Sequence, residues 1–109
     1  MESTLTHLEC GICGESHDAE QFQTICTACG RPLLARYDLD AARRTFDAAA
    51  LGRRVSSLWR YAELLPVRDA GAVVSLGEGM TPLLAAPRLG EEAGVPDLWI
   101  KDEGQNPTG

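Results

Sequence analysis

Hydrophobic positions are unevenly distributed along the 109-residue chain. Residues 1–37 carry few large apolar side chains, and their polar, loop-like pattern cannot bury much of a core by itself. From residue 38 onward, apolar residues recur at the spacings of helices and strands. We therefore divide the chain into a first segment over residues 1–37, which needs another source of stability, and a second segment over residues 38–109.

The second segment begins with two predicted helices. Asp38 is a suitable N-cap, and the apolar periodicity predicts a helix over residues 39–51 that stops at Gly52. Another helix is predicted over residues 57–64, closed by Pro66. The aromatic side chains of this second helix need a surface to pack against.

Beyond Pro66 the pattern changes to strands and turns. We expect a strand over residues 72–76, extended chain over 81–86, a short helix over 88–93 and a strand over 97–102. The turn sequence Gly77-Glu78-Gly79 separates the first two of these elements, and the turn sequence Asn106-Pro107-Thr108-Gly109 follows the last one. Together the elements predict a mixed α/β fold class.

Four cysteines in the first segment form two copies of the motif Cys-x-x-Cys-Gly. They are Cys10, Cys13, Cys26 and Cys29. Each pair can bind one metal ion from a tight turn, the following glycine supplies the conformational freedom of that turn, and four thiolates complete a tetrahedron. The spacing predicts a structural zinc site, whose binding energy of about 10 kcal/mol would stabilise a segment that lacks a core.

Other interpretations of the cysteines remain open. Iron could occupy the same four ligands, and a redox dithiol is a further alternative, although the duplication of the pair argues against it. With four cysteines available, His7 and His17 are expected to be solvated loop residues rather than ligands.

Charge narrows the classes of partner. Sixteen acidic residues against ten basic ones give a net charge of -6, so nucleic acid and anionic membranes are not expected as partners. No stretch approaches the ~20 apolar residues of a membrane span, and the N-terminus lacks the pattern of a secretory signal. We therefore expect a cytoplasmic protein, in which cysteines bind metal rather than form disulfides.

Motifs of the second segment resemble a known family. They are Leu76-Gly-Glu-Gly-Met-Thr-Pro-Leu83 and Trp99-Ile-Lys-Asp-Glu-Gly-Gln-Asn-Pro-Thr-Gly109, preceded by the cysteine motifs and by Ser57-Leu-Trp-Arg-Tyr-Ala-Glu-Leu-Leu-Pro66. In this order they closely resemble the N-terminal part of threonine synthases, which are fold-type-II pyridoxal-phosphate enzymes related to the tryptophan synthase β chain. The resemblance implies a four-cysteine zinc ribbon over residues 1–37 and the start of the pyridoxal-phosphate domain over residues 38–109.

The resemblance also implies where the active site lies. Four motif residues are expected near it: Glu78, Thr81, Asn106 and Thr108. In the family the Asn-Pro-Thr-Gly turn leads into Ser-Phe-Lys, whose lysine binds the cofactor, so that lysine is expected beyond Gly109. The single lysine of this chain, Lys101, is flanked by Asp102 and Glu103 and is expected to have a structural role.

The implied reaction converts O-phosphohomoserine and water to threonine and phosphate, in an enzyme that is commonly a homodimer. By itself the chain is expected neither to bind pyridoxal phosphate nor to turn over substrate. Two alternatives stay open at this point. One is a different β-replacing enzyme of the same superfamily, such as cysteate synthase, and the other is a free-standing zinc-ribbon module that binds a partner protein.

Overall fold

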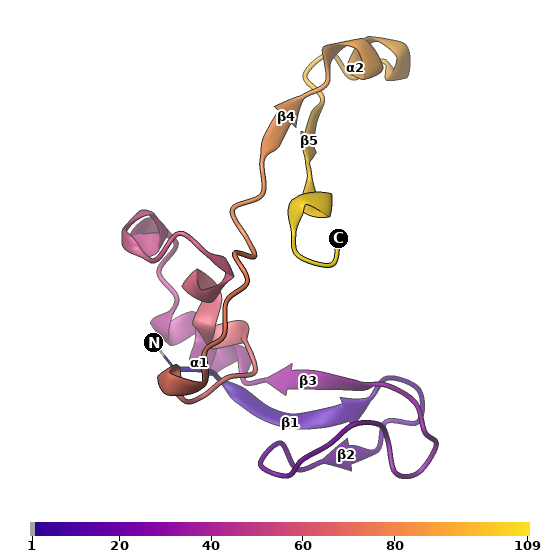
Figure 1. The fold of residues 1–109 in the computed structure, drawn as a ribbon, viewed down its shortest axis with the longest axis vertical. Helices are drawn as coiled ribbons and strands as arrows, with labels where there is room; N and C mark the ends of the chain where they lie inside the picture. The colour runs from indigo at the N-terminus through magenta and orange to yellow at the C-terminus, as the bar shows by residue number, and fades with distance from the viewer. Residues whose placement is uncertain (1) are drawn as a thin grey trace. The chain divides into compact units, whose positions relative to one another are not determined.

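The structure is a computed structural model that describes residues 2–109 and divides them into two compact units (Figure 1). The first unit comprises the described residues up to Arg54 together with Trp59–Val73, and the second comprises Val55–Leu58 and Val74–Gly109. Each unit contains both helices and strands, which confirms the predicted mixture of the two. No helix in the described part of the chain has the length and apolar content that a membrane span needs.

A three-stranded antiparallel sheet forms the first part of the first unit. Its strands are β1 (Leu5–Cys10), β2 (Ser16–His17) and β3 (Leu33–Tyr37). Figure 1 shows β1 between β2 and β3, and Leu8 is paired with His17 on one side and with Ala35 on the other. The prediction of a loop-like segment was wrong here. Its strands were missed because polar residues interrupt their apolar positions and most side chains are only half-buried.

Two short helices replace the single helix predicted over residues 39–51. Helix α1 (Leu39–Thr45) begins as expected, because the Asp38 carboxylate accepts a hydrogen bond from the Ala41 N–H at 2.8 Å. The chain then becomes extended at Phe46, and Asp47 caps a new 3-10 helix, η1 (Ala48–Arg53). The predicted stop at Gly52 was also wrong, because η1 continues through it.

The predicted helix over residues 57–64 is present as the 3-10 helix η2 (Leu58–Leu64), which is kinked at Tyr61. The Tyr61 ring stacks on Phe46 with 6.4 Å between ring centroids. Next to these rings lies the buried side chain of Glu63, which receives two hydrogen bonds from the Arg54 guanidinium. The centre of this unit therefore combines aromatic packing with an ion pair.

Residues 63–68 are joined to the beginning of β1 and the residues just before it by hydrogen bonds whose acceptors are backbone carbonyl oxygens. The Thr4 N–H and Thr4 hydroxyl both donate to the Glu63 carbonyl oxygen, at 2.9 and 2.8 Å, and the Ser3 hydroxyl donates to the Leu65 carbonyl. Arg68 donates to the Leu5 carbonyl and forms an ion pair with Glu20. Residues 63–68 thus fasten the beginning of β1.

The strand predicted over residues 72–76 is absent. A short 3-10 helix, η3 (Ala70–Ala72), occupies its beginning, and residues 73–76 have neither helical nor strand structure. Val74 and Leu76 are exposed, and no described strand pairs with them. A β-branched run has a preference for strand geometry, but the preference is realised only where a neighbouring strand provides hydrogen bonds.

The elements of the second unit are β4 (Leu83–Ala85), α2 (Pro87–Ala93), β5 (Trp99–Lys101) and the 3-10 helix η4 (Glu103–Gln105). The extended chain, the short helix and the last strand are present as predicted, although the strand is shorter than predicted, and η4 was not predicted. β4 and β5 pair antiparallel with Leu84 opposite Ile100, and α2 lies between them along the chain (Figure 1). Helix α2 ends at Gly94, whose φ of 71° is the left-handed conformation that glycine favours at this position.

Candidate metal centre

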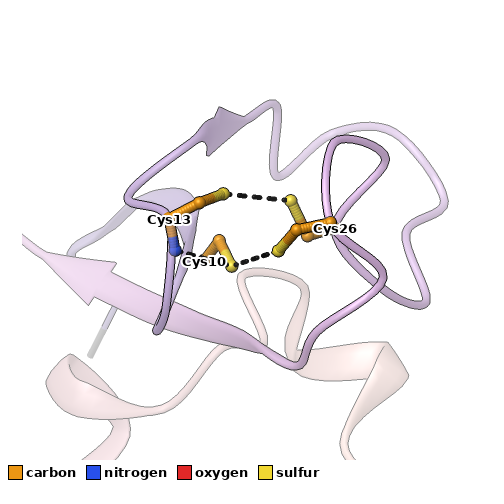
Figure 2. A group of neighbouring side chains, drawn as sticks. Cys10, Cys13 and Cys26 are labelled. Atoms are coloured by element: carbon orange, nitrogen blue, oxygen red, sulfur yellow. Dashed lines mark hydrogen bonds between the residues drawn. The ribbon is translucent and has the colours of Figure 1, made fainter.

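The four cysteines of the two motifs converge on one point in the first unit. All four Sγ atoms lie within 4.8 Å of one another. Figure 2 shows Cys13 and Cys26 facing each other across the two loops, with their Sγ atoms 3.6 Å apart, and the Sγ atoms of Cys10 and Cys29 are 3.5 Å apart. These separations are far above the ~2.05 Å of a disulfide, and all four cysteines are free.

The sulfur separations fit one tetrahedral metal ion. With metal–sulfur bonds of about 2.3 Å, the edges of an ideal tetrahedron of thiolates are ~3.8 Å long. The separations of 3.5 and 3.6 Å lie just below that value, and the upper limit of 4.8 Å allows the remaining edges to reach it with small side-chain adjustments. The predicted ligands are therefore positioned to hold a metal ion, and four protein ligands would leave no open position for substrate.

The two cysteine turns are built by the same local hydrogen bonds. The Gly14 N–H donates to the Cys10 carbonyl at 3.1 Å, and the Gly30 N–H donates to the Cys26 carbonyl at 2.8 Å. Both glycines have a left-handed backbone, with φ of 76° for Gly14 and 72° for Gly30, which uses the conformational freedom expected of a glycine at this place in the motif. Each motif thereby aims two sulfurs at a common point.

The pKa values of Cys10 and Cys29 are shifted in opposite directions. The N–H groups of Cys13 and Ile12 both donate to the Cys10 Sγ at 3.4 Å and lower the pKa of Cys10 to about 6. The Arg31 N–H favours the thiolate of Cys29, but the Cys10 sulfur and burial outweigh it and raise the pKa of Cys29 to about 12. A central cation would offset this repulsion and allow all four thiolates to ionise.

The two histidines near the motifs lie in strands rather than loops. His7 is in β1, where its Nδ1 is 2.9 Å from the Thr6 hydroxyl, and its ring is partly exposed. His17 is buried in β2 opposite Leu8, which corrects the expectation of a solvated side chain. Its Nε2 has no hydrogen-bond partner among residues 2–109. Neither histidine belongs to the group of side chains that converge on the metal position.

In the second unit, the structure brings two of the four predicted active-site residues together. The Thr81 hydroxyl donates to Glu103 Oε1 at 2.7 Å, and the Asn106 amide donates to Glu103 Oε2 at 3.0 Å. The Lys101 ammonium donates to the Thr81 carbonyl oxygen, so this lysine joins two segments of the unit.

The other two predicted active-site residues have different surroundings. The Glu78 carboxylate turns back on its own loop, where it accepts hydrogen bonds from the Leu76 N–H at 2.6 Å and from the Ser75 hydroxyl at 3.1 Å. Thr108 is exposed and has a φ of 73° within the final turn. A place near the active site stays a prediction for all four residues.

Glu103 is the residue that the sequence did not single out. It was interpreted only as a neighbour of Lys101, whereas its carboxylate is the common partner of Thr81 and Asn106. A contact across 22 positions has no periodic signature in one sequence. The only signal in the sequence is that Thr81 lies in one of the two motifs of the second segment and Glu103 lies in the other.

The chain is similar to several threonine synthases. It is 39% identical over 100 residues to that of Methanocaldococcus jannaschii and 37% identical over 103 residues to that of Methanosarcina acetivorans. These matches cover 92% and 94% of this chain. The chain is homologous to threonine synthases. It spans only 24% of the length of either archaeal relative.

A shorter match of higher identity is found to the threonine synthase of Mycobacterium leprae, with 53% identity over 49 residues, which is 45% of this chain and 13% of that protein. No protein-family profile matches the chain. No solved structure matches it either. The resemblance implied by the motifs is thus confirmed at the level of sequence.

Proposed function

We propose that the chain is the N-terminal part of a pyridoxal-phosphate-dependent threonine synthase, which converts O-phosphohomoserine and water to threonine and phosphate. The similarity to two archaeal threonine synthases over nearly the whole chain carries this proposal. The juxtaposition of Thr81 and Asn106, the motif residues assigned to the neighbourhood of the active site, agrees with it. A cytoplasmic location and a homodimeric intact enzyme are further parts of the proposal that rest on the resemblance.

Within this proposal the described residues do not supply a covalent site for pyridoxal phosphate. Lys101 is the only lysine, and its ammonium is engaged by the Thr81 carbonyl. The Asp102 N–H beside it donates to the Pro82 carbonyl at 3.0 Å, which further fixes this lysine within the paired segments. We therefore assign no chemical step to the chain and place the cofactor lysine in the remainder of the intact enzyme.

The role proposed for the first unit is structural. One zinc ion bound by Cys10, Cys13, Cys26 and Cys29 would join the two cysteine turns, and its closed coordination suits stability rather than catalysis. The small number of buried apolar side chains supports this role, because only Cys10, Cys26 and Ala42 are buried hydrophobic residues among those described. Metal binding would supply the folding energy that such a core cannot.

The experiment that tests the enzymatic proposal uses the intact protein that contains this chain. The protein is purified with pyridoxal phosphate, and threonine and phosphate are measured after addition of O-phosphohomoserine. Equimolar formation of the two products is expected. Phosphate or acetate release from O-phosphoserine or O-acetylserine, without threonine formation from O-phosphohomoserine, would identify another β-replacing enzyme. If the protein shows none of these activities and none of its lysines binds pyridoxal phosphate, the alternative of a protein-binding module is favoured.

The metal proposal is tested by elemental analysis of the same purified protein. About one zinc per chain is expected, and Cys26→Ser should lower that content. An iron content of one per chain, with the absorbance of iron–thiolate charge transfer, would assign the site to iron instead.

A further inference from the structure

The Glu103 carboxylate lies at the centre of a hydrogen-bond network in the second unit. Each of its oxygens has a different partner, since Oε1 accepts from the Thr81 hydroxyl at 2.7 Å and Oε2 accepts from the Asn106 Nδ2 at 3.0 Å. Thr81 is buried and Asn106 is half-buried, whereas Glu103 reaches them from the exposed helix η4. One side chain thereby joins the segment that contains Thr81 to the turn that begins at Asn106.

The orientation of the Asn106 amide is fixed by this arrangement. Its Oδ1 accepts a hydrogen bond from the Gly79 N–H at 2.8 Å, while its Nδ2 donates to Glu103. Rotation of the amide by 180° would place a donor against the Gly79 N–H and an acceptor against the Glu103 carboxylate. Both hydrogen bonds would be lost together, so only one orientation satisfies the two neighbours.

The backbone around Gly79 is equally constrained. Gly79 has a φ of 89°, and a Cβ at this position would lie 2.5 Å from the backbone nitrogen of Leu58. The Leu58 N–H in turn donates to the Glu78 carbonyl at 3.0 Å. The Gly79 N–H that donates to Asn106 therefore belongs to a loop whose backbone has little freedom to move away.

We propose that Glu103 is a positioning residue, which holds the Gly77-to-Thr81 loop against the Asn106-to-Gly109 turn by binding Thr81 and Asn106 simultaneously. The inference rests on the proposed function, because Thr81 and Asn106 are the residues assigned there to the neighbourhood of the active site. Glu103 acts through these two side chains. Its negative charge suits this task, since an ionised carboxylate accepts hydrogen bonds at both oxygens and donates none.

A pair of substitutions isolates this role. Glu103→Gln keeps an acceptor for the Thr81 hydroxyl but presents an N–H to the Asn106 Nδ2, which is also a donor. Combining it with Asn106→Asp restores a complete pattern, because the Asp carboxylate accepts from both the Gly79 N–H and the new Gln amide. The double variant thus has the same number of hydrogen bonds as the original, with the negative charge moved from position 103 to position 106.

The test compares both single variants and the double variant in the intact protein. Hydrogen–deuterium exchange of the peptide covering residues 76–82 is measured without cofactor, and kcat and KM are measured with O-phosphohomoserine. For Glu103→Gln we expect about tenfold faster exchange in this peptide and a fall in kcat of similar size, with KM changed less than twofold. The double variant should recover most of the lost protection from exchange, which is the measurement that does not depend on a direct role of Asn106 in the reaction. Glu92→Gln, which removes one exposed carboxylate from α2 of the same unit, should match the unsubstituted protein in both measurements.

The outcomes separate this inference from the proposed function. Unchanged exchange and kcat in Glu103→Gln would overturn the positioning role, as would a double variant in which the peptide covering residues 76–82 exchanges no more slowly than in Glu103→Gln alone. If the unsubstituted protein forms no threonine, the proposed function fails, and the exchange measurement still decides whether Glu103 holds the two segments. Should Glu103→Gln not fold, Thr81→Val removes only one of the two hydrogen bonds and is expected to raise exchange less. No change in that variant would also count against the inference.

Discussion

The buried pair formed by Arg54 and Glu63 is expected to determine the stability of the first unit. The Arg54 Nη1 and Nη2 donate to the two Glu63 oxygens at 2.9 and 2.7 Å, and the side chains are 10% and 1% exposed. Arg54 also donates to the Arg60 carbonyl and lies over the Phe46 ring. Glu63→Gln would leave the guanidinium buried with one neutral acceptor in place of a carboxylate.

The expected cost of Glu63→Gln is about 3 kcal/mol, the lower end of the range for removing one partner of a buried ion pair, because the amide oxygen retains one hydrogen bond. Small domains are stable by only about 5–15 kcal/mol, so the loss is a large fraction of the total. With an m-value of about 1.5 kcal/mol/M in urea, the unfolding midpoint should fall by about 2 M. The midpoint is measured by titrating the metal-bound protein with urea and monitoring unfolding by circular dichroism.

An exposed pair in the same unit provides the matched control. Arg43 follows Asp40 by three positions on α1, and the Arg43 Nη1 lies 2.9 Å from the Asp40 Oδ1. Both side chains are 78% exposed. Asp40→Asn removes the same kind of charge from a solvated site and should cost less than about 0.5 kcal/mol. If Glu63→Gln costs no more than Asp40→Asn, the buried ion pair does not stabilise the unit and the reasoning from burial is wrong.

The buried pair of Arg54 and Glu63 also predicts that the stability of the first unit depends on pH. The hydrogen bonds from the Arg54 guanidinium hold the pKa of Glu63 below its usual value. Because the folded pKa is below the unfolded one, the associated stability is present above about pH 4.5 and is lost as the pH falls through the folded pKa. The difference in unfolding free energy between the original protein and Glu63→Gln should therefore shrink below pH 4.5. A difference that stays constant down to pH 3 would contradict this assignment.

Three further predictions concern the metal centre and one glycine. Removing the metal with a chelator should unfold the sheet around Cys10 and Cys26. Circular dichroism should then show a loss of strand signal that returns when zinc is added. An unchanged spectrum would argue against a structural metal. Acidification should release metal as protons compete for the thiolates, which a zinc-sensitive dye would follow; retention of metal at pH 3 would contradict thiolate ligation. Gly79→Ala should destabilise the second unit by about 1–3 kcal/mol because of its positive φ and close contact, whereas Gly52→Ala, with open space around it, should be neutral or slightly stabilising.

The two cysteine turns were predictable from the sequence because the geometry of each turn is local. Each cysteine pair lies within one turn, and the glycine after it marks the backbone conformation of that turn. The Asp38 cap and the end of α2 at Gly94 were predictable for the same reason, since caps depend on residues only a few positions apart. Such features require no knowledge of the tertiary structure.

Features that depend on distant residues were not predictable. The strand β1 forms against Leu33–Tyr37, and nothing in its own six residues shows that partner. Arg54 and Glu63 are an ordinary pair of charges in the sequence and become a buried contact only when η2 folds back on Phe46. Homology identified the motifs around Thr81 but not the carboxylate that holds them, because motif similarity does not show which side chains touch.

The hydrogen bonds between Thr4 and the Glu63 carbonyl have a consequence for transplanting the cysteine-containing segment into another protein. Residues 2–37 contain all four cysteines, yet the start of β1 is fastened by Glu63 and the residues after it, which lie well beyond the end of β3 at Tyr37. A graft limited to residues 2–37 would carry the four cysteines into a host protein but leave the Ser3 hydroxyl and the Thr4 N–H and hydroxyl without these acceptors. The smallest portable form of this segment is therefore discontinuous, and a host would have to receive residues 59–68 along with residues 2–37.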